Sequence, residues 1–394
     1  MGTSSLLCPS YKMVALKSPF ILSGNSMKIV FVADNVDGER SGGVVSTRRF
    51  IDYFKKTDDL TVVSSGKADD NKIVFPAFYV PFAKKQMQEM DFLFVWPNKK
   101  NLKQAIQAAD LVHIQFPFIL GYQALKIARQ LNKPVVFGFH VQPENLMWNI
   151  GLDYDWLNAF LYRFFIRTFY SKADLVFAPS EFAKQMLEKY ALQVPIEIIS
   201  NGLPKQFKPK QSVREPEFID KFVILMVGRL AKEKRHDLVM QAIQQSKFKD
   251  KIQLVVTGQG SLRAELIELG NALPNPAFFE YVSQEKLISL FNSSDLFIHA
   301  SEIELEGMAV LEAIGCGLPA LISDAEHSAS AQFALNEDFL FTAGDVDSLR
   351  TKMDYWIEHE ELLKGSKQAY LEKAQSYAFE ASVQKARELY QGLV

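Results

Sequence analysis

Short apolar runs alternate with amphipathic segments along almost the whole chain. The runs that read as strands span residues 28–33, 111–114, 134–139, 175–178 and 196–199 in the first half, and residues 222–227, 252–257 and 295–301 in the second. After each run the chain continues into a polar or glycine-containing loop. This alternation predicts parallel sheets with helices on both faces, the doubly wound α/β class.

The chain is long enough for two domains of this class. Its 394 residues exceed one ordinary core and fit two domains of roughly 180 residues each. Gly202, Pro204, Pro209 and Pro216 interrupt regular structure over residues 201–216, and we therefore place the interdomain linker there.

Charged and glycine residues gather where two strands of the second half end. The run 222–227 is followed by Gly228, Arg229 and Lys234. An arginine fork and a mobile lysine at the carboxyl end of a strand match what a diphosphate needs, although a basic pair taken alone is usually a solvated charge run. The run 252–257 leads into Gly258, where the backbone can approach a ligand closely. The dinucleotide fingerprint is absent because Arg263 occupies the position of its third glycine.

Two carboxylates bracket a glycine in the most informative segment, residues 304–312. Glu304 lies in a polar loop after the 295–301 strand, and Gly307 precedes the helix that carries Glu312. The N–H groups at the start of that helix, beside Gly307 and Met308, are free to bind an anion or a polyol. The carboxylates lie too far apart along the helix to share one atom, so they suit two hydroxyl-bearing parts of an elongated ligand. Taken in isolation, both residues would be ordinary helix-flanking glutamates.

The first half offers a glycine pair and one histidine at strand ends. A long polar loop after the first strand ends in Gly42 and Gly43, before a helix that we expect to begin near Val44. His140 follows the 134–139 strand and should emerge at the interdomain cleft, although a lone histidine there is more often structural. His113 also lies near a strand end, and the other four histidines have no comparable constellation.

Composition excludes several classes of protein. The chain is 48% hydrophobic and 23% charged, a globular composition. Its net charge of −2 combines a basic half, with 24 Lys and Arg against 18 Asp and Glu in residues 1–205, and an acidic half. The basic half is expected to face an anionic surface. No run approaches the roughly 18 apolar residues of a membrane span, and no feature indicates nucleic-acid binding.

The two cysteines exclude a disulfide framework and favour the cytoplasm. We expect the Cys316 side chain to be an unreactive part of the apolar packing. Residues 1–26 lack the apolar region of a secretory signal, and we expect them to form a disordered, dispensable extension.

No metal or cofactor site is expected. Residues 153–155 and 345–347 each read Asp-x-Asp, but both precede helix-like segments, and N-capping explains them. No Cys/His cluster has zinc spacing, and no serine nucleophile elbow is present.

Taken together, these segments resemble the retaining glycosyltransferases of family 4, which have the GT-B fold. The resemblance covers residues 27–394 and rests on motifs in the family's order and approximate spacing: Gly42-Gly43-Val44, His140, Pro179-Ser180, Asn201-Gly202, Gly228-Arg229-Leu230, Glu233-Lys234, Thr257-Gly258-Gln259-Gly260, Tyr281-Val282, and residues 304–319.

The resemblance implies an architecture. It consists of an acceptor-side Rossmann-like domain over residues 27–203 and a Rossmann-like domain that binds the nucleotide sugar over residues 204–376. The two domains face each other across a cleft, and a C-terminal helix over residues 377–394 packs back on the first domain.

The resemblance also implies roles. The departing nucleotide diphosphate is stabilised by Arg229, Lys234 and the Gly42 and Gly43 amides. His140 contacts the donor sugar, Glu304 holds sugar hydroxyls, and Glu312 holds the ribose. The backbone at Val282 contacts the base. Gly258, Gly307 and Met308 complete the donor site. The catalytic residues are then His140, Arg229, Lys234 and Glu304.

One departure from the family pattern is Glu306, because the family often has an aromatic residue between the positions of Glu304 and Gly307. This third acid bears on which sugar the site selects. The closest likeness is to diacylglycerol glucosyltransferase-like members, which implies a lipid acceptor and a place on the inner face of the cell membrane. Aromatic residues and lysines interleave over residues 78–103, which suits an anionic lipid surface. Core aromatics beside solvated lysines explain the pattern equally well. A glycosyltransferase of envelope polysaccharide assembly and a non-catalytic nucleotide-sugar-binding scaffold remain alternatives.

Overall fold

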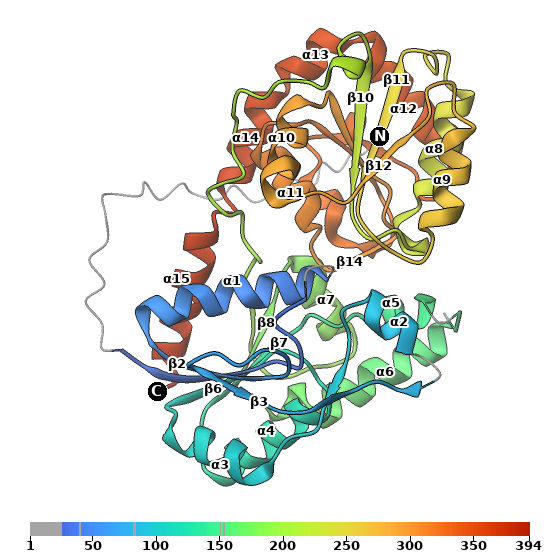
Figure 1. Cartoon of the computed structure of the whole chain (residues 1–394). Helices are drawn as coiled ribbons and strands as arrows, with labels where there is room; N and C mark the ends of the chain where they lie inside the picture. The colour runs from blue at the N-terminus through green and yellow to red at the C-terminus, as the bar shows by residue number, and fades with distance from the viewer. Residues whose placement is uncertain (1–25, 39–40, 82–83, 150, 153) are drawn as a thin grey trace, which may run out of the picture.

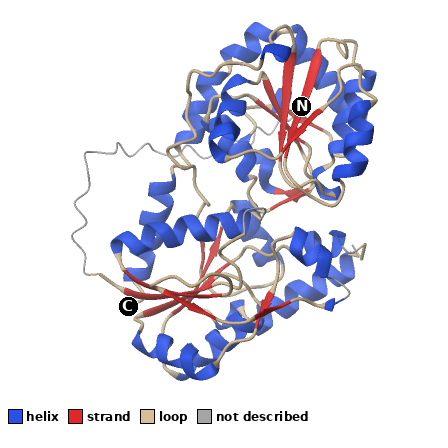
Figure 2. Cartoon of the chain, in the orientation of Figure 1, coloured by secondary structure: helices blue, strands red, loops and turns tan. Residues whose placement is uncertain are grey.

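The computed structural model describes residues 26–38, 41–81, 84–149, 151–152 and 154–394. Two α/β lobes lie one above the other, each a sheet between helices (Figures 1 and 2). The expected disordered extension, including Cys8, lies outside the described residues except for Ser26. Asp153, the first acid of one Asp-x-Asp segment, lies outside them as well.

The N-terminal domain is built on a seven-stranded parallel sheet in the order β3-β2-β1-β6-β7-β8-β9. Its strands are β1 Lys28–Val32, β2 Asp59–Ser64, β3 Lys72–Val74, β6 Leu111–Ile114, β7 Val135–Gly138, β8 Leu175–Ala178 and β9 Ile196–Ile198. Its helices are α1 Gly42–Thr57, α2 Lys84–Glu89, α3 Lys99–Ala108, α4 Ile119–Gln130, α5 Pro143–Asn149, α6 Asp155–Thr168 and α7 Glu181–Lys189. A separate antiparallel hairpin pairs β4 Ala77–Phe78 with β5 Phe94–Val95.

The C-terminal domain is built on a six-stranded parallel sheet in the order β12-β11-β10-β13-β15-β17. Its strands are β10 Phe222–Val227, β11 Ile252–Thr257, β12 Phe278–Glu280, β13 Leu296–His299, β15 Ala320–Ser323 and β17 Leu340–Phe341, with β14 Ile303–Glu304 paired separately to β16 His327–Ser328. Its helices are α8 His236–Gln245, α9 Arg263–Asn271, α10 Gln284–Ser293, α11 Met308–Gly315, α12 Val346–Glu358, α13 Glu360–Gly365 and α14 Lys367–Gln375.

Both sheets have the strand order of a doubly wound fold, which confirms the predicted fold class. All eight predicted strands form, and helix α1 begins at Gly42 rather than near Val44. Five strands of the two sheets were not predicted, namely β2, β3, β12, β15 and β17. In β15 the reason is that helix α11, Leu318 and the strand form one nearly continuous apolar run, in which hydrophobicity marks no boundary.

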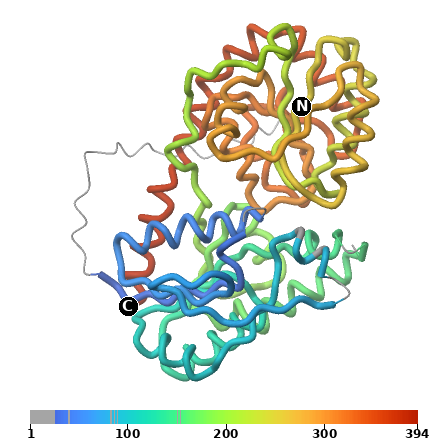
Figure 3. The backbone as a smooth tube through the Cα atoms, in the orientation of Figure 1, coloured from blue at the N-terminus to red at the C-terminus, as the bar shows by residue number. Residues whose placement is uncertain are grey.

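The chain crosses between the domains twice, and the two crossings lie side by side (Figure 3). Leu203 on the outward crossing donates to the Tyr377 carbonyl at 2.6 Å and accepts from the Phe379 amide at 3.1 Å on the return. Gly202 has a φ of +75°, and a Cβ there would lie 2.6 Å from Phe379 Cα. Glycine is therefore required where the two crossings pack together.

After the return crossing, the last helix, α15 Phe379–Gln391, packs on the N-terminal domain. Val383, Ala386 and Tyr390 belong to that domain's core cluster, and buried Arg387 donates to Asp58 at 3.0 Å. The Tyr390 hydroxyl lies 2.6 Å from His113 Nδ1. His113 is thus part of the core, and its burial lowers its pKa to about 3.

Candidate active site

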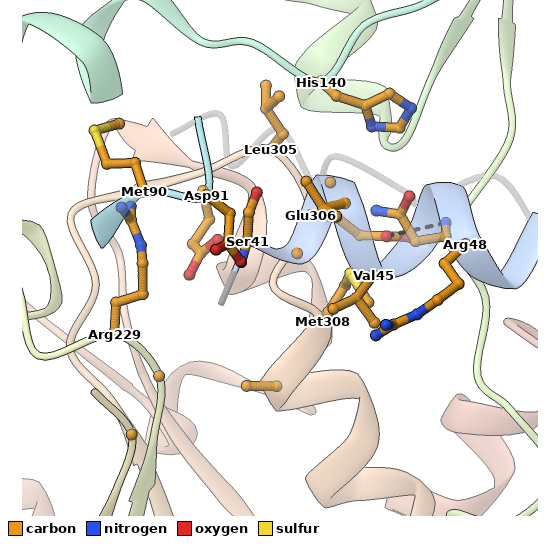
Figure 4. Close-up of a pocket in the computed structure, with 18 of the residues that line it drawn as sticks. Ser41, Val45, Arg48, Met90, Asp91, His140, Arg229, Leu305, Glu306 and Met308 are labelled. Carbon is orange, nitrogen blue, oxygen red and sulfur yellow. Dashed lines mark hydrogen bonds between the residues drawn. The ribbon is translucent and has the colours of Figure 1, made fainter. Parts of the chain in front are cut away.

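A cleft of about 990 Å³ lies between the two domains and is lined by both. In each sheet the strand order reverses beside the central strand, β1 or β10, and ligands of such folds bind outside the carboxyl ends of the strands there. Residues that follow β1, β6, β7, β10 and β11 all line this cleft. Figure 4 shows Arg229 and Glu306 from one domain and Ser41, Asp91 and His140 from the other around the same space.

The structure brings together every residue that the sequence assigned to the site. All eleven line the cleft: His140, Arg229, Lys234 and Glu304, together with Gly42, Gly43, Gly258, Val282, Gly307, Met308 and Glu312. They come from segments up to 270 residues apart in the chain.

The loops after β10 and β11 are packed against each other at the edge of the cleft. A Cβ at Gly258 would lie 1.8 Å from the Gly228 carbonyl oxygen, so a side chain there would displace the β10 loop. This close approach explains the glycine at position 258 and positions Arg229.

Arg229 connects the two domains. Its Nη2 donates to Glu233 Oε1 at 2.7 Å and to Asn145 Oδ1, from helix α5 of the N-terminal domain, at 3.2 Å. Glu233 is fully buried. The guanidinium is thus held at the cleft by a buried carboxylate, and neither Glu233 nor Asn145 was assigned this role from the sequence.

Lys234 and Glu304, which the sequence assigned to different parts of a ligand, are bonded to each other. Lys234 Nζ donates to Glu304 Oε1 and lies 3.3 Å from Ser301 Oγ. His299 Nε2 lies 3.3 Å from the same Glu304 oxygen. Burial alone would raise the pKa of Glu304, but Lys234 and His299 outweigh it and hold this pKa well below its usual range.

We expected no group of functional residues around His299, and the structure shows that this expectation is wrong. It ends β13 next to the central strand β10, and its ring reaches the Glu304 carboxylate. Its position at a strand end was visible in the sequence. The contact with Glu304 depends on the loop that turns back through β14.

The Glu306 side chain is hydrogen-bonded to residues at the beginning of the linker. Its carboxylate accepts hydrogen bonds from the Ser200 hydroxyl and, at 3.1 Å, from the Asn201 amide, and Asn201 in turn accepts from the Ser46 hydroxyl of α1. Glu306 is 2% exposed, and burial raises its pKa to about 7 against these hydrogen bonds. The third acid therefore joins the β14–α11 loop to the linker and to α1, although it also lines the cleft.

His140 lies half-buried at the end of β7 with its ring beside Phe116, the ring centroids 6.5 Å apart. Burial lowers the pKa of His140 to about 4. The imidazole is therefore neutral at neutral pH, so that one ring nitrogen donates and the other accepts hydrogen bonds.

Two helices begin at the cleft. Gly42 and Gly43 are the first residues of α1, and Met308 is the first residue of α11 after Gly307 in the left-handed region at φ +98°. The first N–H groups of a helix lack intrahelical acceptors and attract anions. Helix α1 also carries Arg48 and Arg49 into the cleft lining, and Figure 4 shows Arg48 there. Neither arginine was assigned to the site, although their spacing after the glycine pair was visible in the sequence.

The Asp-x-Asp segments differ in their capping. Asp345 caps α12 by accepting from the Ser348 amide at 3.0 Å. Asp155, by contrast, is the first residue of α6, whose N-cap is Tyr154 without a side-chain hydrogen bond, so Asp155 is not the N-cap of this helix. Asp153, the other acid of the segment, lies outside the described residues. Among the described residues, no group of three or more His, Cys, Asp or Glu is placed to hold a metal ion.

Cys316 is buried, which raises its pKa to about 12.

Two family models match the chain in succession. The model described as Glycosyltransferase Family 4 matches residues 40–207, and the model described as Glycosyl transferases group 1 matches residues 207–374. The boundary between them falls in the linker.

Relatives with known names match at low identity. The chain is 26% identical over 230 residues to alpha-monoglucosyldiacylglycerol synthase of Streptococcus pneumoniae, covering 54% of this chain and 51% of that protein. It is 26% identical over 296 residues to sulfoquinovosyl transferase SQD2 of Arabidopsis thaliana, covering 71% and 56%. The matches thus span about half the length of these curated relatives.

A solved structure extends the likeness to the whole fold. Anabaena Alr3699/HepE in complex with UDP and glucose has a TM-score of 0.71 at 17% identity, covering 93% of this chain and 100% of that one. The two successive family models together span residues 40–374, and the chain therefore belongs to the glycosyltransferases. Its two parallel-sheet domains and the likeness to HepE give it the GT-B fold.

Proposed function

We propose that this protein is a retaining glycosyltransferase of family 4 that moves a hexose from a nucleotide-diphosphate sugar to the hydroxyl of a membrane lipid such as diacylglycerol. The observation that carries this proposal is the gathering of Arg229, Lys234, Glu304 and Glu312 in one interdomain cleft. Two cations for a diphosphate and two carboxylates for hydroxyl groups are the recognition elements of a nucleotide sugar.

In the proposed donor complex, Arg229 and Lys234 bind the diphosphate together with the amides of Gly42 and Gly43. Glu304 then exchanges its contact with Lys234 for the sugar hydroxyls. Glu312, whose Oε1 accepts from Arg49 Nη2 at 2.7 Å, exchanges that contact for the ribose. The backbone of Val282 contacts the base. The HepE structure is a complex with UDP and glucose, and this supports a nucleotide-sugar donor of that type.

The proposed chemistry retains the anomeric configuration. The acceptor hydroxyl attacks from the face that the diphosphate leaves, and an oxygen of the leaving phosphate takes the acceptor proton. Catalysis then consists mainly of electrostatic stabilisation of the departing diphosphate by groups already in place. Neutral His140 contacts the donor sugar, a role that its low pKa supports because neutral imidazole both donates and accepts hydrogen bonds.

A lipid acceptor is supported by the surface of helix α6. Trp156, Phe160 and Phe164, four residues apart on one face, are 70%, 58% and 46% exposed, and Arg163 and Arg167 of the same helix are exposed as well. Exposed aromatic rings beside cations suit the interface of an anionic membrane. None of the helices in the described parts of the chain is long and apolar enough to cross a bilayer. From the exposed rings and cations of α6 we propose peripheral binding to the inner face of the cell membrane.

The sequence left two explanations open for residues 78–103, a membrane-binding surface and a core of aromatic residues beside solvated lysines. The segment contains residues of both kinds. Trp96 and Phe78 are 64% and 37% exposed, whereas Phe92 and Phe94 are half-buried. The four lysines at positions 84, 85, 99 and 100 are exposed, which supports a contribution of this segment to the membrane-binding surface.

The decisive test incubates the protein with a panel of radiolabelled nucleotide sugars and a bacterial lipid extract, and then separates the lipids by thin-layer chromatography. Incorporation of label into a neutral lipid, with retention established by NMR of the product, supports the proposal. Label that enters only polyprenyl-linked glycan would favour polysaccharide assembly. Nucleotide-sugar binding without transfer would favour a non-catalytic scaffold.

A further inference from the structure

A continuous row of aromatic rings leads from the cleft to the outside of the N-terminal domain. It starts at His140, whose ring centroid is 6.5 Å from that of Phe116. Phe116 is 6.2 Å from Phe118, and Phe118 is 4.6 Å from Phe92. Phe92, Phe116 and Phe118 line the cleft itself.

The row continues through the β4–β5 hairpin. Phe118 is 5.6 Å from Phe94, Phe94 is 5.6 Å from Phe78 across the hairpin, and Phe78 is 6.4 Å from Trp96. Exposure rises along the row, from 8% at Phe116 to 37% at Phe78 and 64% at Trp96.

This gradient is unlike that of a closed core cluster. The hairpin lies outside the seven-stranded sheet, and its rings at Phe78, Phe94 and Trp96 stay partly exposed. Exposed aromatic rings continuous with a cleft indicate a surface for an apolar ligand. The rings at Phe92, Phe94 and Phe118 meet at 70° to 87°, so they offer no single flat platform of the kind on which a sugar ring stacks.

The inner end of the row is polar. Asp34, Phe116 and His140 follow β1, β6 and β7, three neighbouring strands, so an acid and a histidine flank the innermost phenylalanine. Asp34 lines the cleft, is 3% exposed, and its Oδ1 has no hydrogen-bond partner among the described residues. Burial raises the pKa of Asp34 to about 8, so its carboxyl is mostly protonated at neutral pH and both donates and accepts hydrogen bonds.

We propose that this aromatic row, from Trp96 to Phe116, binds the apolar body of a neutral lipid acceptor while Asp34 binds its hydroxyl end beside His140. This inference rests on the proposed function and gives it a specific acceptor subsite. It requires an acceptor that is apolar along most of its length and carries a hydroxyl at one end. The acceptor then passes from the membrane to the cleft without crossing a polar surface, which would be costly for acyl chains.

Photo-crosslinking tests the row without requiring catalysis. A diacylglycerol with a diazirine in one acyl chain, dispersed in detergent with UDP present, is irradiated with the full chain, and labelled peptides are identified by mass spectrometry. We expect label within residues 90–96 and 116–118. The Phe92→Ala/Phe118→Ala double variant should reduce that label about tenfold, because two rings of contact are lost.

A second pair of variants avoids the risk of unfolding. Phe78→Ser removes a ring of the row at 37% exposure, and Phe278→Ser removes a ring of matched 40% exposure in the C-terminal domain. Only the first should reduce the label. The proposal is overturned if wild type is not labelled in these segments, if Phe78→Ser and Phe278→Ser behave alike, or if a soluble oligosaccharide competes as well as unlabelled diacylglycerol.

Transfer measured in parallel separates the two proposals. If wild type is labelled along the row but transfers no sugar from any nucleotide sugar to the same lipid, the subsite stands and the proposed activity fails. If the double variant transfers sugar to the lipid with an unchanged KM for the lipid, the activity stands and the subsite is overturned.

Discussion

Arg49 of helix α1 and Glu312 of helix α11 form an ion pair across the interdomain cleft, with Nη2 and Oε1 2.7 Å apart. Burial raises the pKa of Glu312, and Arg49 opposes that shift. The carboxylate that we assign to the ribose is therefore already satisfied, and a nucleotide must compete with Arg49 for it.

This competition predicts opposite effects for the two members of the pair. Glu312→Gln should weaken UDP binding about tenfold, because a charged acceptor of the ribose hydroxyls is lost. Arg49→Gln should leave the affinity unchanged or increase it, since the competitor is removed. Isothermal titration calorimetry measures both constants. Equal weakening in the two variants would mean that the pair serves only to hold the domains together.

The contact of Glu306 with the linker predicts a pH-dependent stability. Its pKa of about 7 in the folded protein lies above the ordinary glutamate value of about 4.3. Between these values the native state holds a proton that the unfolded chain has lost, so this residue's contribution to stability falls as pH rises from about 4.5 to 7. Glu306→Gln stays neutral and should gain on wild type by up to about 3 kcal/mol over that range.

Urea denaturation at pH 5, 6, 7 and 8 measures this difference. The exposed residue Glu326 provides the control Glu326→Gln, which removes a surface carboxylate and leaves the buried contact of Glu306 with the linker intact. Parallel curves for wild type and Glu306→Gln would contradict the prediction.

The diphosphate site predicts a loss of turnover without a loss of fold. Arg229→Ala and Lys234→Ala should each lower kcat by about 10²-fold or more, because a charge-assisted contact to the leaving group disappears. Lys232→Ala, at an exposed lysine of the same loop, is the matched control. Steady-state kinetics and circular dichroism separate the two effects. Near-normal turnover of both cleft variants would remove these residues from the site.

Cations of the protein, rather than a metal, are proposed to stabilise the leaving diphosphate. Activity should therefore persist in excess EDTA, measured as sugar transfer before and after dialysis. Complete loss that Mn²⁺ or Mg²⁺ restores would overturn the mechanism and direct attention to Asp153 and Asp155.

The membrane-binding surface predicts a dependence on lipid charge. The protein should sediment with vesicles that contain anionic lipid and not with neutral ones. Binding should weaken as salt rises, since the Debye length is already about 8 Å at physiological ionic strength. Reversing Lys84, Lys85, Lys99 and Lys100 to Glu should weaken binding and leave nucleotide-sugar binding intact.

Exposed lysines of the C-terminal domain provide the control for that charge reversal, namely Lys247, Lys249, Lys251 and Lys364. Their reversal to Glu should leave vesicle binding unchanged. Equal and negligible binding of wild type to both vesicle types would exclude this surface as a membrane contact.

The sequence by itself determined the elements and the places where ligands can bind. Apolar runs such as Phe222–Val227 form strands buried on both faces, because they are too short for an ordinary helix and are bounded by charged residues and glycine. In a parallel sheet the carboxyl ends of the strands meet at one edge, which predicts Gly42 and His140 together at the edge of one sheet and Arg229 and Glu304 together at the edge of the other. That the two edges face each other across one cleft was implied by the resemblance to the GT-B glycosyltransferases.

Only the tertiary structure decided which of these groups bind one another. The contacts of Glu304 with Lys234, of Glu312 with Arg49 and of Glu306 with Ser200 join residues 70, 263 and 106 positions apart. No periodicity encodes such pairings. The first depends on the loop that turns back through β14 within the C-terminal domain, and the other two depend on how the second domain closes on the first. The aromatic row has the same origin. Its rings were visible in the sequence as a mixed segment, but packing of the β4–β5 hairpin against the residues after β6 aligned them into a path.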